Sequence, residues 1–201
     1  MVMALKPLHD VFTLKELVVS TYQSTSGAGY KCINELTKQH EQLIKHQPIY
    51  PCYFKKQIAF NVIPQIDEFI NTGYTKEEMK MINETKKILN LEDIPITATC
   101  VRVPVVRGHA VSVYAKFEKN ISIDKAVEVM NSFEGVTVSD DPYITPIDVA
   151  NKNDVFVSRI RKHPSIENAL SFWCVSDNLR KGAALNAIQI VAKMIKNDYK
   201  C

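Results

Sequence analysis

The sequence predicts an α+β fold in which a mixed, largely antiparallel sheet carries helices on one face. Segments with the two-residue period of strands alternate irregularly with segments of helical period, which is typical of this class. The clearest strand signal is residues 98–117, where two alternating segments flank the turn-like residues 104–108, and we interpret it as a hairpin. With 201 residues, 46% of them hydrophobic, the chain can build one sizeable core, so we expect one domain over residues 1–201.

The predicted hairpin places two polar side chains at the ends of apolar rows. Arg102 ends one row and His109 begins the other; the remaining members are Ile96, Ala98, Cys100, Val111, Val113 and Ala115. A buried guanidinium must meet an anion or several acceptors, and an imidazole beside it can titrate near neutral pH. Each residue alone has an equally good structural explanation, an ion pair to a carboxylate for Arg102 and a bond to the backbone for His109. The two together at one sheet end favour a functional site.

The N-terminal third is expected to form helix, strand, helix and strand in turn. Helical spacing predicts a helix at residues 1–12, although no capping residue precedes it. A β-branched run predicts a strand at residues 17–22, and residues 28–46 have the length and charge mix of an amphipathic helix. The turn between them, residues 23–29, can present amides to an anion, but helix capping is the commoner role of such a Ser-Gly turn. An apolar segment at residues 58–66, interrupted by one proline, is interpreted as another strand.

A helix at residues 75–89 has the clearest boundary signals. Thr75 is its expected N-cap, acidic residues occupy the first turn, and two lysines lie in the last. Glu77 and Lys80 are three residues apart and share one helix face. The alternative to a functional role for this pair is an exposed ion pair, which stabilises a helix by a few tenths of a kcal/mol, roughly.

Helix and strand signals continue to the C-terminus. We expect a helix at residues 123–133, strands at 136–138, 154–160 and 172–175, and a final amphipathic helix capped by Asp177. The sheet face opposite the helices is then free to meet a partner; its predicted residues include Thr97, Thr99, Val101 and Tyr114.

Charge and hydropathy indicate neither a nucleic-acid binder nor a membrane protein. The formal net charge is +3, from 25 basic and 22 acidic residues, and the basic residues are scattered along the chain. No apolar run approaches the roughly 20 residues that a membrane-spanning helix needs.

The cysteines suggest neither disulfides nor a metal site. They lie at positions 32, 52, 100, 174 and 201, without a C-x-x-C pair or regular spacing, which fits a reducing cytoplasm. His40, His46 and Cys52 carry side chains that can bind a metal, but a spacing of six puts the two histidines on different helix faces. We therefore expect no bound metal.

Several motifs, in one order along the chain, resemble the catalytic and dimerisation domain of the aspartate-semialdehyde dehydrogenases. The resemblance covers essentially the whole sequence and implies the α+β fold of the catalytic domain of glyceraldehyde-3-phosphate dehydrogenase-like enzymes. The motifs are residues 20–29 (STYQSTSGAG), 60–65 (FNVIPQ), 77–80 (EEMK) with 84–89 (ETKKIL), 100–105 (CVRVPV) with Gly108 and His109, and 176–184 (SDNLRKGAA).

The resemblance implies roles for five residues in catalysis and substrate binding. His109 matches the family's acid/base, and Gln23 matches the glutamine that orients the intermediate. Arg102 matches the clamp on the substrate carboxylate, a role for which a planar guanidinium is suited. Glu77 matches the acid that holds the substrate ammonium, and Lys80 the phosphate-binding lysine.

In that family, the resemblance implies, a thiolate attacks the aldehyde of aspartate semialdehyde, hydride passes to NADP, and phosphate releases aspartyl phosphate. The physiological direction is the reverse, in the synthesis of lysine, threonine and methionine. Asp177 and Asn178 match positions where the family approaches the nicotinamide. The resemblance also implies a cytoplasmic homodimer that takes small anionic substrates, aspartate semialdehyde and phosphate, and binds neither nucleic acid nor membrane.

One departure from the family pattern limits these expectations. The family's nucleophilic cysteine lies a few residues before the segment that resembles residues 1–8, after a nucleotide-binding domain, and neither is within these 201 residues. Residues 1–14 are then the remnant of the helix that follows that cysteine. We expect a substrate-binding and dimerisation domain that binds no NADP and is inactive by itself. The alternative is a non-catalytic dimerisation or small-anion-binding module.

Overall fold

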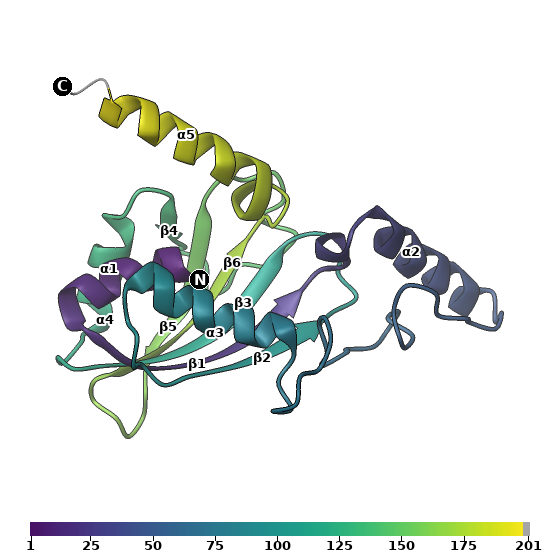
Figure 1. Ribbon diagram of the computed structural model, residues 1–201, viewed down its shortest axis with the longest axis horizontal. Helices are drawn as coiled ribbons and strands as arrows, with labels where there is room; N and C mark the ends of the chain where they lie inside the picture. Colours follow the sequence, from purple (N-terminus) through teal and green to yellow (C-terminus); the bar gives the residue numbers. More distant parts are fainter. Residues whose placement is uncertain (199–201) are drawn as a thin grey trace.

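A computed structural model of the chain describes residues 1–198 and contains a six-stranded mixed sheet with the order β2-β1-β3-β6-β5-β4 (Figure 1). The strands are β1 (Leu14–Gln23), β2 (Ile96–Arg102), β3 (His109–Phe117), β4 (Val136–Val138), β5 (Val155–Lys162) and β6 (Ala169–Ser176). The helices are α1 (Val2–Phe12), α2 (Tyr30–Ile44), α3 (Lys76–Leu89), α4 (Ile123–Asn131) and α5 (Leu185–Asp198). Three of the five strand pairings are antiparallel, which confirms the predicted α+β class.

The predicted hairpin at residues 98–117 is wrong, because β1 lies between its two strands. β1 pairs in parallel with β2 and antiparallel with β3. The connection between β2 and β3 passes over the end of β1, where the amides of Thr25 and Ser26 donate to the carbonyls of Val105 and Val106 at 2.8 and 3.1 Å. Residues 104–108 therefore bridge two strands that are not neighbours.

Helices α1, α3 and α4 cover one face of the sheet, as predicted, and form the main core with it (Figure 1). Leu5, Leu8 and Phe117 are fully buried in this core. Burial of each such side chain contributes about 1.5–3 kcal/mol. Helix α3 begins with the predicted cap: the Thr75 hydroxyl accepts from the Glu78 amide, and the Glu78 carboxylate accepts from the Thr75 amide.

None of the described helices covers most of the opposite sheet face (Figure 1). Val18 and Tyr22 of β1 are 39% and 37% exposed there. Tyr22 lies against Trp173 of β6, with ring centroids 5.3 Å apart. Only one end of this face is covered, where Ile144 and Val149 pack on the sheet in a small second cluster.

Helix α2 and the loop that follows it form a lobe beside the sheet, and the strand predicted at residues 58–66 does not form there. Only Ile63 bridges to a strand, at Arg102. The amides of Ile58 and Ala59 donate instead to Oε1 of Gln39 on α2, at 2.9 and 3.0 Å. Because the Gln39 side chain accepts these two backbone hydrogen bonds, the amides are not available to a neighbouring strand, and the apolar segment packs as a loop.

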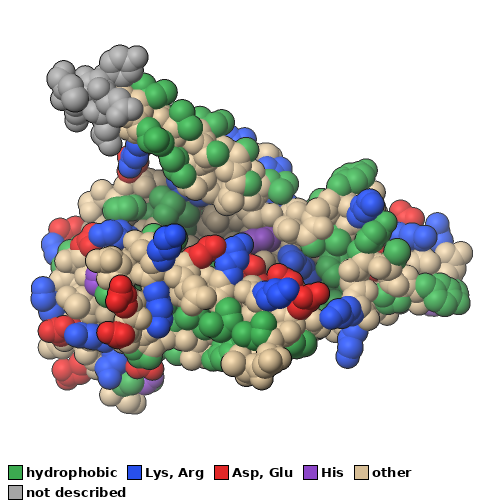
Figure 2. Space-filling view, in the orientation of Figure 1, with side chains coloured by type: hydrophobic (Ala, Val, Ile, Leu, Met, Phe, Trp, Pro, Cys, Tyr) green, Lys and Arg blue, Asp and Glu red, His purple; other side chains and the backbone are tan. Residues whose placement is uncertain are grey.

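The chain leaves the sheet through a kinked turn, Arg180–Ala184, before α5 begins at Leu185. The prediction that Asp177 caps this helix is wrong: its carboxylate accepts from the amide of Leu179 at 2.9 Å, well before α5 starts. Helix α5 projects from the body (Figures 1 and 2). Ile188 and Val191, two residues of its predicted apolar face, are exposed. None of the described helices has the length and apolar character needed to cross a bilayer.

Candidate functional site

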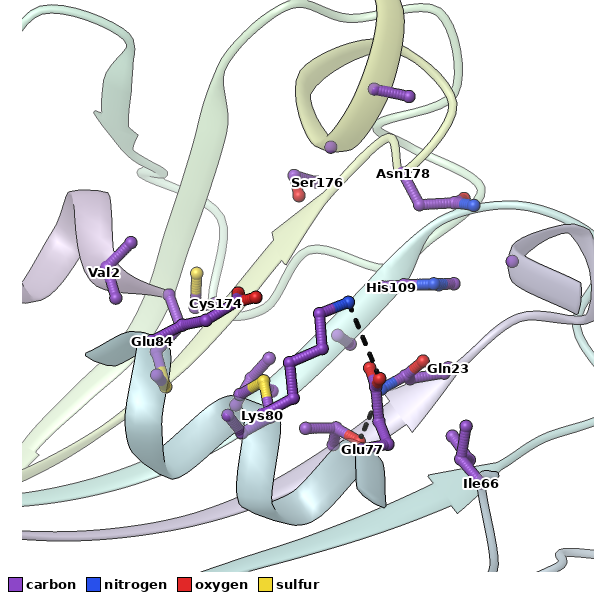
Figure 3. A pocket seen from close by; sticks show the side chains of 18 of the residues that line it. Val2, Gln23, Ile66, Glu77, Lys80, Glu84, His109, Cys174, Ser176 and Asn178 are labelled. Atoms are coloured by element: carbon purple, nitrogen blue, oxygen red, sulfur yellow. Dashed lines mark hydrogen bonds and ion pairs between the residues drawn. The ribbon is translucent and has the colours of Figure 1, made fainter. Parts of the chain in front are cut away.

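A cavity of about 640 Å³ lies between α3, the ends of β1 to β3 and the turn before α5 (Figure 3). Five residues with predicted roles line it, although they come from distant parts of the chain. They are Gln23 of β1, Arg102 of β2, His109 of β3, and Glu77 and Lys80 of α3. Figure 2 shows the hollow beneath α5 on the molecular surface.

Glu77 is held at the mouth of the cavity by two neighbours. Its Oε1 accepts from Nε2 of Gln23 at 3.1 Å, and its Oε2 lies 3.8 Å from Nζ of Lys80 (Figure 3). The Lys80 side chain is 60% exposed, so the ion pair by itself stabilises α3 only slightly. The next residue, Glu78, points into the protein, where its Oε1 accepts from the amide of Cys100 at 3.0 Å. One residue of helical rotation thus separates a cavity carboxylate from a structural one.

Arg102 brings a buried charge to the cavity without an acidic partner. The residue is 6% exposed, and its Nη1 donates to the carbonyl of Ser24 at 2.6 Å. Within residues 1–196, whose side chains the structure describes, no carboxylate forms an ion pair with it. Burial lowers the pKa of this guanidinium, which expresses the cost of keeping it charged there. An anion in the cavity would offset that cost.

His109 sits beside Arg102 with one ring nitrogen bonded to the backbone. Its Nδ1 accepts from the amide of Ser24 at 3.0 Å, so the structural explanation considered for this residue is partly right. Burial, and then the charge of Arg102, lower the pKa of His109 to about 4. The ring is therefore neutral at physiological pH. Its Nε2 faces Gly27, where an added Cβ would lie 2.8 Å away.

The two residues predicted to approach a cofactor are placed differently. Asn178 lines the cavity, and its Oδ1 accepts from the amide of Gly108 at 2.9 Å. Asp177 is fully buried, is not among the cavity-lining residues, and pairs with Arg107 at 2.7 Å. Burial would raise the pKa of the Asp177 carboxyl, but the bonds from Arg107 and the amides of Asn151 and Leu179 lower it overall.

Sequence reasoning missed three residues that hold the site together. Ser24 contacts both His109 and Arg102, Ser26 exchanges hydrogen bonds with Asn178, and Arg107 neutralises Asp177. The signal was present in the Ser-Gly turn at residues 23–29. Its serines bond to side chains, however, and do not cap α2, whose N-terminal residues receive no side-chain cap.

Neither Cys32 nor Cys100 has the surroundings of an activated nucleophile. Burial raises the pKa of Cys100 to about 11 and also raises that of Cys32. Cys100 is thus a small buried hydrophobe, as the sequence favoured. Cys174 is also buried, at the floor of the cavity, and Cys201 lies outside the described residues. The described part of the chain gathers no set of three potential metal ligands.

The start of α1 reaches the same cavity. Met1 and Val2 line it together with Glu77 and His109 (Figure 3). The N-terminal end of α1 therefore borders the cavity.

Comparison with known proteins identifies the family of the chain. Residues 5–181 match the family model described as semialdehyde dehydrogenase, dimerisation domain. The chain is 47% identical over 201 residues to the aspartate-semialdehyde dehydrogenase of Aquifex aeolicus; the match covers 98% of the chain but 59% of that protein. The chain thus spans about three fifths of the length of this relative.

Solved structures give the same result. The crystal structure of aspartate-semialdehyde dehydrogenase II from Vibrio cholerae superposes with a TM-score of 0.94 at 41% identity, covering 98% of this chain and 59% of that one. The structure of that enzyme complexed with ASA superposes with a TM-score of 0.92 at 42% identity, covering 96% and 58%. The fold expected from the sequence is confirmed. The chain belongs to the semialdehyde dehydrogenase family and is its dimerisation domain, related over this length to the aspartate-semialdehyde dehydrogenases.

Proposed function

We propose that this chain is the substrate-binding half of an NADP-dependent aspartate-semialdehyde dehydrogenase. The observation that carries the proposal is the unpaired charge of Arg102, buried at a cavity that also contains Glu77, Lys80 and His109. A substrate with a carboxylate and an ammonium group complements this set of charges.

The proposed substrate contacts follow from the chemistry of the lining groups. The guanidinium of Arg102 binds the substrate carboxylate, because a planar fork donates two parallel hydrogen bonds to it. The carboxylate of Glu77 binds the substrate ammonium, and Gln23, which already donates to Glu77, keeps that carboxylate in place. Lys80 is mostly exposed at the mouth and attracts phosphate.

His109 exchanges a proton with the oxygen of the reacting carbonyl in this proposal. The covalent step needs a thiolate, and burial raises the pKa of both Cys32 and Cys100, which disfavours the thiolate at these two positions. We propose that a nucleotide-binding half supplies both the thiolate and the NADP site next to the start of α1, where Met1 and Val2 line the cavity. When NADP is bound there, it supplies hydride chemistry. The chain by itself is then inactive.

Anion binding tests the charge of the cavity separately from catalysis. Isothermal titration with phosphate and with an aspartate analogue should detect binding to the wild-type chain and a loss of at least about tenfold with Arg102→Met or Lys80→Met, from the 1.5–3 kcal/mol of a charged hydrogen bond. Lys86→Met is the matched control, because Lys86 lies on the same helix but outside the cavity. Equal binding by wild type and Arg102→Met would contradict the proposal.

Reconstitution tests the complete activity. NADPH formation from aspartate semialdehyde and phosphate should be absent with the chain alone and appear after mixing with a separately made nucleotide-binding half. His109→Ala should then reduce turnover by about 10² to 10⁴, the usual contribution of acid–base catalysis, whereas His163→Ala, at a half-buried position outside the cavity, should not. Turnover by the chain alone would contradict the predicted inactivity.

We further propose that the uncovered sheet face forms a homodimer, as the name of the family model suggests. Val18, Tyr22 and Trp173 give this face an apolar centre. Sedimentation at tens of micromolar protein should show a dimer, since an interface of about 1,600 Å² is usually stable there. Tyr22→Asp should shift it to monomer, while Tyr50→Asp, at an exposed position of the loop after α2, should not.

A further inference from the structure

Ser24 contacts both charged or titratable side chains at the inner end of the cavity. Its amide donates to Nδ1 of His109 at 3.0 Å, and its hydroxyl oxygen lies 3.0 Å from the same nitrogen. Its carbonyl accepts from Nη1 of Arg102 at 2.6 Å. The backbone here is extended, with φ −67° and ψ 157°, so these contacts arise at the point where β1 passes into the turn.

The bond from the Ser24 amide determines which nitrogen of His109 carries the proton. A backbone N–H can only donate, so Nδ1 must offer its lone pair and cannot itself be protonated. A neutral imidazole has one N–H, which is then on Nε2. This nitrogen faces the space above Gly27, where an added Cβ would lie 2.8 Å from it, and both residues line the cavity.

We propose that Ser24 is a positioning residue that holds His109 as the neutral tautomer protonated on Nε2, so that the ring presents a hydrogen-bond donor to the cavity. The ligand atom that fits this donor is an anionic oxygen or sulfur: a carboxylate, an oxyanion or a thiolate. The tautomer does not rest on the proposed function. The consequence for catalysis does rest on the proposed function: in that reaction His109 first donates a hydrogen bond to such an atom and does not first act as a base.

The surroundings of the ring disfavour the doubly protonated form that would break this arrangement. Protonation of Nδ1 would bring two N–H groups against each other at the Ser24 amide. The charge of Arg102 lowers the pKa of His109, whereas a hydrogen bond between the ring and the Gly108 backbone, and then the charge of Asp177, raise that pKa by less. The Ser24 hydroxyl has one proton to donate, and its contact with Nδ1 of His109 at 3.0 Å is shorter than its contact with Oδ1 of Asn178 at 3.3 Å, so we assign the proton to Nδ1. Oδ1 of Asn178 accepts from the Ser26 hydroxyl at 3.2 Å.

The tautomer can be measured on the chain as it is, without substrate or activity. Nitrogen-15 spectra of the imidazole rings distinguish a protonated from a bare nitrogen at each position. His9 and His163 also accept a backbone amide on Nδ1, from Leu14 and Ser165 at 3.2 and 3.1 Å, and serve as references for that bond without a hydroxyl beside it. We expect His109 to have a bare Nδ1 and a protonated Nε2 throughout pH 5–8. A protonated Nδ1, or a mixture of tautomers, would overturn the proposal.

Two serine variants separate the role of Ser24 from that of the hydroxyl network. Ser24→Ala keeps the amide but removes the hydroxyl beside Nδ1, so the neutral form loses part of its stabilisation. We expect the pKa of His109 to rise by roughly 0.5 to 1 unit, the equivalent of one net hydrogen bond. Ser26→Ala removes a hydroxyl of the same network that does not touch the ring, and should leave the ring signals unchanged. No shift with Ser24→Ala, or an equal shift with Ser26→Ala, would overturn the assignment to Ser24. Failure of anion binding with the tautomer intact would instead count against the proposed function.

Discussion

The α2 lobe and the cavity each contain a glutamate on a helix, and the two glutamates are used in opposite ways. Glu35 of the lobe is 7% exposed and accepts four hydrogen bonds, from the amides of Cys52, Tyr53 and Phe54 and from Nε2 of Gln39. Glu77 of the cavity has one hydrogen bond, from Gln23, and a loose ion pair with Lys80. A carboxylate saturated by backbone donors holds a loop in shape, whereas an unsaturated one retains capacity for a ligand.

The comparison predicts that charges saturated by the protein matter for stability, whereas unsaturated charges in the cavity matter for binding. Four substitutions test this difference, beginning with the largest expected change in the free energy of unfolding.

Glu35→Ala should destabilise the chain by about 2–4 kcal/mol, because three backbone amides lose their acceptor in a partly buried place. Urea denaturation measures the loss, and amide exchange at Tyr53 and Phe54 shows whether it begins in the lobe. Glu41→Ala is the control, since this exposed residue of the same helix should change stability by less than about 0.5 kcal/mol. Similar losses of unfolding free energy in both variants would show that the hydrogen bonds of Glu35 do not stabilise the lobe.

Asp177→Asn should destabilise by about 2–3 kcal/mol at neutral pH, because it leaves the charge of Arg107 without its partner. The pKa of Asp177 is lower in the folded chain than in the unfolded one, so its stabilisation is complete above the unfolded pKa of about 3.9. It disappears as the pH falls through the folded pKa. Denaturation at several pH values should therefore show the wild type and the variant converging below about pH 4. A difference that persists unchanged to pH 3 would contradict this assignment.

Arg102→Met should change the free energy of unfolding by no more than about 1 kcal/mol, although it replaces a buried residue. The variant loses the bond to the Ser24 carbonyl but also removes a charge that has no acidic partner within the described residues. Thermal unfolding measures the difference. Arg161→Met, at an exposed position of β5, is the surface control. A loss above about 3 kcal/mol would make Arg102 structural and weaken the case for an anion site.

Glu77→Gln should have the smallest effect on stability, within about 0.5 kcal/mol, while it removes the negative charge of the cavity. Its neighbour supplies the matched control: Glu78→Gln disturbs the cap of α3 and the bond to the Cys100 amide, and should cost about 1 kcal/mol. Denaturation of both variants in parallel gives the comparison. Equal losses would show that helical rotation does not separate the two carboxylates as described.

Local signals in the sequence were enough to predict structural features that involve only residues close together in the chain. The cap of α3 by Thr75 and Glu78 was recognisable because all its atoms lie within one helical turn. The buried ends of two strand rows pointed to Arg102 and His109, since a charge in an apolar row is anomalous whatever the topology.

Features that join distant segments could not be predicted in this way. The turn signal at residues 104–108 was real, but nothing in those residues shows that β1 occupies the space between β2 and β3. The strand expected at residues 58–66 failed for the same reason, because its amides are taken by Gln39 of α2. The contacts of Ser24 with both His109 and Arg102 also exist only in the folded chain.

The central position of β1 has a consequence for the order of events during synthesis. Leu17 pairs with Ile96 on one side and with Ala115 on the other, so both neighbours of β1 are translated long after it. Until then, a strand with fully buried positions in the finished sheet has two unpaired edges. Closure of such long loops is slow and entropically unfavourable, and no hairpin with a neighbouring segment can pair β1 early. An unpaired apolar strand of this kind is prone to aggregation while the chain is incomplete.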